Sequence, residues 1–174
     1  YTPNTLALSK GSLMQTVTPT YNGGTVTSWS ISPALPTGLS LSASTGAISG
    51  TPTAITPSTA YTVTASNTGG SASTIVTIEV NEAVPVIAYG TTTLTTQINL
   101  QINTITPTSP GGPVATWSIS PTLPTGLNID ASTGEISGAP IVVSQSTVYT
   151  ITASNSGGTA VSYTHLRAHE TCVH

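Results

Sequence analysis

Residues 29–52 read WSISPALPTGLSLSASTGAISGTP, and residues 117–140 repeat this stretch as WSISPTLPTGLNIDASTGEISGAP. The spacing is 88 residues, and it holds outside the stretch, since Tyr1 falls on Tyr89. From Trp29 to Asn67, 26 of 39 positions are identical to their counterparts 88 residues later. A repeat of this length corresponds to a whole small domain, so we interpret the chain as a tandem array.

Each repeat has the pattern of an all-β domain. Short runs rich in Thr, Val and Ile alternate with clusters of Gly, Pro, Asn and Ser. Apolar and polar residues alternate in Tyr61–Ser66 and Val76–Val80, and Asn67-Thr68-Gly69-Gly70 between them suits a hairpin turn. We therefore predict two β-sandwiches of about seven strands each. The strands expected in the first repeat are Thr5–Leu8, Ser12–Thr18, Thr25–Ile31, Leu39–Leu41, Ala47–Ser49, Ala60–Ser66 and Ser73–Val80.

Trp29 and Trp117 lie in the middle of equivalent predicted strands, each two residues before an isoleucine. A tryptophan can stack on a ligand or fill a core, and its large apolar ring favours the core here. We expect both indoles to be buried between the sheets.

We place the domains at residues 1–82 and 83–162, with residues 163–174 as a tail that does not belong to the repeat. Tyr1 matches Tyr89, whose own domain starts several residues earlier, so we expect repeat one to lack its first residues. The repeat fails from Val161 onward, so we expect the last strand of repeat two to be incomplete, with Tyr163 and Leu166 imitating part of it, and its sheet edge to be poorly specified.

The tail also holds a group of metal-binding residue types: His165, His169, Cys172 and His174. Structural zinc sites usually pair two separated ligand clusters, and this is one cluster at a terminus. The tail resembles translated sequencing-adapter read-through. We therefore assign it no metal site.

Composition excludes several classes of partner. Charged residues make up 4% of the chain and the net charge is −3, with Lys10 and Arg167 as its basic side chains. Binding to nucleic acid requires clustered basic residues, so we expect no nucleic-acid partner. No run of 18 apolar residues is present, so we expect no membrane span in this sequence.

The residues 29–52, together with Tyr61–Asn67, resemble the bacterial Ig-like repeats of the Putative Ig domain family, which are related to cadherin-like and dystroglycan-type modules. Repeat two carries the same motif. The resemblance implies an immunoglobulin-like sandwich from a large secreted or surface-anchored bacterial protein. In that family such repeats serve as stalks, spacers or adhesive modules, with neighbouring repeats as their partners.

Catalysis has few candidate residues before the tail. Residues 1–160 hold no His, Cys or Arg, so a Ser or Thr nucleophile has no histidine base. The acidic residues of this stretch are Glu79, Glu82, Asp130 and Glu135. Asp130 and Glu135 flank one turn, but repeat one has Ser42 and Ala47 there. We predict no enzyme, no catalytic residue and no required cofactor.

Calcium is the remaining chemical option, because the stretch from Asp130 to Glu135 looks like an acidic turn near a cadherin junction. Calcium takes about 6–8 oxygen ligands, and the linker Val80–Pro85 has no run of acidic residues. We therefore expect no calcium at the junction within this chain. Asp130 and Glu135 either form a solvated turn, which we favour, or contribute to a calcium site against a further repeat.

Two functions remain open, since an enzyme would require Asp130 and Glu135 to line a cleft. The first is a non-catalytic structural or adhesive spacer, located outside the cell or on its surface. The alternative is an accessory module that binds glycans or surface proteins through its strand-end loops. Tyr21, whose counterpart is Ser109, is the aromatic candidate in such a loop.

Overall fold

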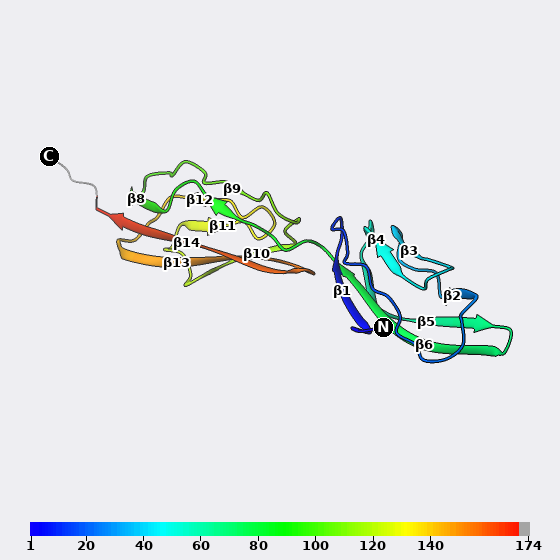
Figure 1. Ribbon diagram of the computed structural model, residues 1–174. Coiled ribbons are helices and arrows are strands. Elements are labelled where there is room, and N and C mark those ends of the chain that lie inside the picture. The colour runs from blue at the N-terminus through cyan, green and yellow to red at the C-terminus, as the bar shows by residue number, and fades with distance from the viewer. Residues whose placement is uncertain (171–174) are drawn as a thin grey trace. The chain divides into compact units, whose positions relative to one another are not determined.

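The computed structural model describes residues 1–170, and the chain divides into two compact units, Tyr1–Glu82 and Ala83–His174 (Figure 1). The regular elements of residues 1–170 are all strands. That part of the chain accordingly offers no apolar helix that could cross a membrane.

Unit one forms a two-layered β-sandwich. One layer is a four-stranded sheet in the order β1-β6-β5-β2, in which β1 is parallel to β6 and the other neighbours are antiparallel. The other layer is the β3–β4 hairpin, extended by a single bridge between Val17 and Ile48. The strands of residues 1–82 are β1 (Thr5–Ser9), β2 (Ser28–Ser32), β3 (Leu39–Leu41), β4 (Ile48–Gly50), β5 (Thr56–Asn67) and β6 (Gly70–Asn81).

The core of unit one follows from the period-two alternation of its two long strands. Val76, Ile78 and Val80 of β6 are each at most 1% exposed, because every second residue of a strand faces the same side. Ile48 of β4 is fully buried and packs into the same cluster from the second layer, as does Trp29 of β2. Burial of both tryptophans, Trp29 at 8% exposure and Trp117 at 6%, is confirmed.

Unit two repeats this sandwich. Each strand of unit one recurs 88 residues later without a shift, and β8 is again parallel to β14 in the sheet β10-β13-β14-β8. The two-residue strands β7 and β9 are additional and pair with each other. The strands of residues 83–170 are β7 (Ala88–Tyr89), β8 (Thr93–Gln97), β9 (Pro107–Thr108), β10 (Thr116–Ser120), β11 (Leu127–Ile129), β12 (Ile136–Gly138), β13 (Ser144–Asn155) and β14 (Gly158–His169).

The predicted all-β sandwich is confirmed, but one predicted strand is wrong. Ser12–Thr18 forms no strand and has one bridge, at Val17. Met14 and Val17 make its hydrogen bonds to the second layer: the N–H of Met14 donates to Gly50, and Val17 exchanges two bonds with Ile48. Gln15 and Thr16 between them are exposed. Inward residues spaced by three do not fit a two-residue strand period.

The predicted incomplete last strand is also wrong for the residues that the structure describes. β14 continues past Ser162 to His169 and lies between β13 and β8. Thr164, Leu166 and Ala168 are buried at the positions of Val76, Ile78 and Val80. Alternation therefore persists where residue identity is lost, and it is enough to keep the strand in register.

We predict that Leu166→Ala destabilises unit two by about 2–5 kcal/mol, because it removes a side chain that is 2% exposed in a packed core. Urea unfolding combined with hydrogen exchange would assign the loss to residues 83–170. Arg167→Ala, at the neighbouring exposed position, is the control and should change stability little. Equal effects of the two changes would contradict the packing of this segment.

Candidate functional site

The side chain of Asp130 closes the turn in which this residue lies. One oxygen of the carboxylate, Asp130 Oδ1, accepts hydrogen bonds from the backbone N–H of Ser132 at 2.7 Å, from its hydroxyl at 2.5 Å and from the N–H of Thr133 at 3.0 Å. The Ser132 hydroxyl and N–H, followed by the Thr133 N–H, hold the pKa of Asp130 below its usual value because they stabilise the charged form. This carboxylate therefore acts as a turn acceptor.

Repeat one closes the same turn with a neutral residue. Ser42 Oγ accepts the N–H of Thr45 at 3.2 Å, and the N–H of Gly46 donates to the carbonyl of Ser42, as Gly134 does to Asp130. The same turn forms with serine in place of aspartate. The role of Asp130 in closing the turn therefore explains this residue without a bound ligand.

Glu135 lies on the other side of this turn and is engaged separately. Its Oε1 accepts the Thr106 hydroxyl at 3.3 Å, while its backbone carbonyl accepts the N–H of Asp130. Among residues 1–170, no three His, Cys, Asp or Glu side chains are grouped closely enough to hold a metal ion. A calcium contribution from Asp130 and Glu135 stays a prediction.

The tail residues are only partly described. His165 and Arg167 are exposed on β14, alternating with buried Leu166 and Ala168, and His169 ends the strand half-buried. Cys172 and His174 lie outside the described residues. The structure thus places the two described histidines on the outward side of a strand.

Tyr21 lies in the loop that the sequence singled out for binding. It is 55% exposed, and its ring packs edge-on against Trp29, with the ring centroids 5.7 Å apart. It lines both a groove of about 370 Å³ beside Gly23 and Gly24 and a smaller hollow of about 160 Å³ at Trp29. This loop is the principal candidate site in unit one.

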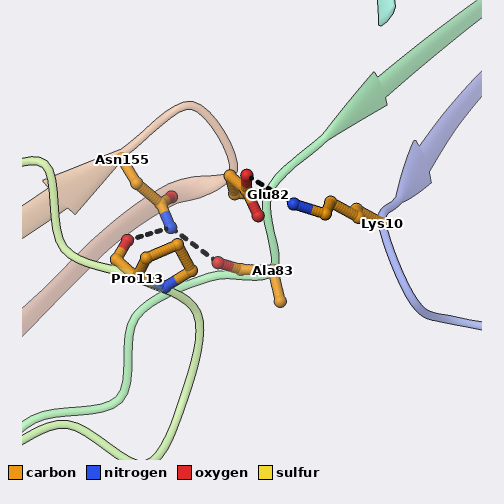
Figure 2. Close-up of polar contacts among 5 residues, drawn as sticks. All are labelled: Lys10, Glu82, Ala83, Pro113 and Asn155. Carbon is orange, nitrogen blue, oxygen red and sulfur yellow. Dashed lines mark hydrogen bonds and ion pairs between the residues drawn. The ribbon is translucent and has the colours of Figure 1, made fainter. Parts of the chain in front are cut away.

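The equivalent loop of unit two is held by Asn155, which sequence reasoning treated only as part of a hairpin turn. Figure 2 shows its side-chain amide donating to the carbonyl of Ala83 at 2.7 Å and to that of Pro113 at 2.9 Å. Its Oδ1 accepts the N–H groups of Gly157 and Gly158. Asn67 makes the corresponding bonds to Thr25, at 3.2 Å, and to Gly69.

Figure 2 also shows the ion pair of unit one, in which Lys10 Nζ lies 3.2 Å from Glu82 Oε1. The lysine side chain is 42% exposed, and exposed pairs of this kind contribute about 0–1 kcal/mol. This pair is therefore a surface contact with little effect on stability.

Unit two has a hollow of its own, of about 680 Å³, between β8 and residues 100–106. Hydroxyl and amide side chains such as Gln101, Asn103 and Thr104 line it, together with Leu100 and His169. Neutral polar groups of this kind can hydrogen-bond to a sugar. No tyrosine or tryptophan is among the residues lining this hollow, so it provides no ring for stacking.

Comparison with known proteins identifies the fold. The family model described as Putative Ig domain matches residues 1–81 and again residues 83–167. No match was found among curated protein sequences.

Solved structures with similar folds include Drosophila OTK extracellular domains 3–5, at 16% identity and a TM-score of 0.53, covering 94% of this chain and 58% of that one. The titin domains Z1Z2 in complex with telethonin match at 19% identity and a TM-score of 0.46, covering 96% and 93%. The four N-terminal Ig domains of Dscam1 isoform 9.44 match at 15% identity and a TM-score of 0.48, covering 95% of this chain and 43% of that one. At 16% identity the likeness to the OTK domains concerns the fold alone.

We predict that Asp130→Ala lowers the melting temperature of unit two at neutral pH, whereas Asp130→Ser preserves most of it because Ser42 supports the same turn. The folded pKa of Asp130 is depressed, so its stabilising effect is present above the unfolded value and is lost as the pH falls through the folded pKa. Thermal unfolding at neutral and strongly acidic pH would measure this. A penalty for Asp130→Ala that is the same at both pH values would contradict it.

Proposed function

This chain belongs to the Putative Ig domain family, and from that premise we propose that its two units form a non-catalytic structural or adhesive spacer in a larger secreted or surface-anchored bacterial protein. The proposal draws support from the way each unit would carry tension. Its partners would be neighbouring Ig-like repeats in the same protein.

The observation that carries the proposal is the parallel pairing of β1 with β6 in unit one and of β8 with β14 in unit two. Five residue pairs join each couple, from Thr5↔Thr77 to Ser9↔Asn81 and from His165↔Thr93 to His169↔Gln97. When the chain is stretched, the first strand of each parallel pair is pulled at its N-terminal end and the second strand at its C-terminal end. Tension along the chain therefore loads the whole ladder in shear, so its hydrogen bonds share the load.

The flanking hydrogen bonds indicate which backbone groups would carry this load. Thr77 N–H donates to the Asn4 carbonyl at 2.8 Å, and Lys10 N–H donates to the Asn81 carbonyl at 2.8 Å. In a parallel ladder alternate residues of one strand bond to the partner, so the N–H of Leu8 points to β6 and that of Ala7 points away.

The side chains that offered chemistry are also consistent with a spacer. Asp130 accepts hydrogen bonds from its own turn, and Asn155 bonds to backbone groups of its own unit. Polar groups committed in this way stabilise loops and need no substrate to explain them.

The alternative is an accessory module that binds carbohydrate or a cell surface. The 680 Å³ hollow of unit two, with the amides of Gln101 and Asn103, and the exposed ring of Tyr21 favour it. A binding role would depend on these residues, whereas a spacer role would not.

Force spectroscopy of the full chain should give two unfolding events, each releasing roughly 250 Å of contour. Leu8→Pro should lower the unfolding force of unit one by removing an N–H from the sheared ladder, which lowers the barrier by about 1–3 kcal/mol. Ala7→Pro controls for proline at a neighbouring position and Leu8→Ala controls for the lost side chain. An unchanged force for Leu8→Pro would contradict the shear mechanism.

A glycan array probed with the full chain should show no retained glycan under the spacer proposal. The array should be repeated with Gln101→Ala and with Tyr21→Ser. The second change gives the loop of unit one the residue that unit two has at the equivalent position, Ser109. If the parent chain binds a glycan and either variant loses that binding, the result contradicts the spacer proposal and supports the binding module.

A further inference from the structure

β8 is an edge strand, and the backbone groups on its outer side have no partner strand. Its ladder to β14 runs from the carbonyl of Thr92, which accepts a hydrogen bond at 2.8 Å, to the N–H of Ile98, which donates one at 3.0 Å. Alternate residues of β8 bond to β14, so the N–H and C=O groups of Thr93 and Thr95 point away from it. Within residues 1–170, no backbone hydrogen bond reaches these two residues from the open side.

This edge contains no charged residue, no proline and no bulge. Proteins commonly use these three features to prevent an edge strand from pairing with another chain. β8 has the sequence TLTTQ, and its five residue pairs with β14 follow one another without a register shift. A strand added to this edge would therefore meet neither a charge nor an irregularity of the backbone.

The hollow of unit two lies along the open edge. Residues 94–97 line it on one side and residues 100–106 on the other, and its volume of about 680 Å³ is in the range of about 300–1,000 Å³ that is usual for ligand sites. Part of its lining is apolar, since Leu94, Ile102 and Ile105 belong to the core of unit two or pack against it. No Lys, Arg, Asp or Glu is among the described residues that line it. The hollow is thus suited to uncharged, aliphatic side chains.

Two side chains in the lining reach less far than their counterparts in unit one. Thr96 and Ile102 are both 7% exposed and line the hollow. Unit one has Leu8 and Met14 at the equivalent positions. The shorter side chains of unit two fill less of the space beside the edge strand.

We propose that the open edge of β8 is a binding site for an extended, uncharged peptide segment of another protein, which adds to the sheet as an antiparallel strand. Antiparallel pairing is slightly more stable than parallel pairing. A residue opposite Thr95 exchanges both backbone hydrogen bonds with it, and the aliphatic side chains before and after that residue enter the hollow. A regular row of N–H and C=O groups matches a peptide backbone better than the hydroxyls of a glycan. The site is independent of the spacer function, which relies on the opposite side of β8.

The test adds the capped peptide SVTVTS to the isotope-labelled full chain. Saturable shifts are expected at the backbone amides of Thr93, Thr95 and Ile102. Two derivatives carry N-methyl groups, one on both threonines of the peptide and the other on both valines. Threonine methylation removes the N–H groups that face β8 and should weaken binding at least about tenfold, whereas the valine N–H groups point away and their methylation should have little effect.

The decisive variant of the protein is Thr95→Pro. It removes an N–H that does not bond to β14, so the fold should be kept, but it takes a donor from the open edge and places a ring there. Peptide binding should fall at least about tenfold. Ala7→Pro, the matched change in unit one, should leave binding unchanged, and so should Thr95→Ala, which keeps the backbone N–H. Thermal unfolding of each variant would verify that the fold is kept.

A second variant tests the hollow itself. The double change Thr96→Leu and Ile102→Met gives unit two the side chains that unit one has at these positions, Leu8 and Met14, which pack in the core of unit one. The variant should therefore fold, while the longer side chains occupy the space that the peptide requires. Binding should be weakened at least about fivefold.

Four results would overturn the proposal. The first is the absence of saturable shifts at millimolar peptide. The second is an equal effect of the two methylated derivatives, or a loss of binding through the valine derivative instead. The third is undiminished binding by Thr95→Pro. The fourth is a soluble oligosaccharide that shifts the same amides while the peptide does not, which would assign the hollow to a glycan.

Discussion

Each unit depends on the contact between a tryptophan ring and a glycine with no side chain. Gly46 and Gly134 have φ of +72° and +74°, and a Cβ on either would lie 2.6 or 2.5 Å from the ring of Trp29 or Trp117. A side chain is therefore excluded both by the backbone conformation and by the indole. The contact fixes the turn after β3 or β11 against the large sheet and so sets the distance between the two layers.

A tyrosine at the start of each unit completes this contact. The hydroxyl of Tyr89 donates to the carbonyl of Gly134 at 2.6 Å, and its ring meets Trp117 edge-on. Tyr1 makes the same bond to Gly46. Burial raises the pKa of both phenols to about 12, so they remain neutral donors over the ordinary pH range. One buried carbonyl thereby links a turn, a core ring and the first residues of the unit.

The sequence allowed the fold to be predicted wherever one side of a strand is buried along its length. The alternation in Tyr61–Ser66 and Val76–Val80 located β5 and β6 correctly, because inward positions there require apolar residues. Ser12–Thr18 has comparable strand propensity, but it meets the second layer at points three residues apart. Propensity could not show that this run lacks a continuous partner.

In β14 the residues differ from those of repeat one, but every second position is still buried. Thr164 and Ala168 replace Val76 and Val80 in the core, so unit two buries fewer methyl groups and one hydroxyl, whose bond to the Thr91 carbonyl is long at 3.5 Å. These changes weaken a core without reversing which residues face it. Comparing identities between repeats therefore overestimated the disruption, whereas comparing inward positions would have predicted the strand.

The candidate site could be predicted only in part, for a reason that lies in the chain's connectivity. Asp130 and Tyr21 stood out because they differ between the repeats, yet Asp130 serves the same turn as Ser42. Asn155 was overlooked because it is identical in both repeats and bonds Ala83, 72 residues away. Both asparagines hold the loop before the next strand of their unit, Asn155 through Pro113 and Asn67 through Thr25. A role that both repeats share leaves no difference between their sequences, so comparing the repeats could not single these residues out.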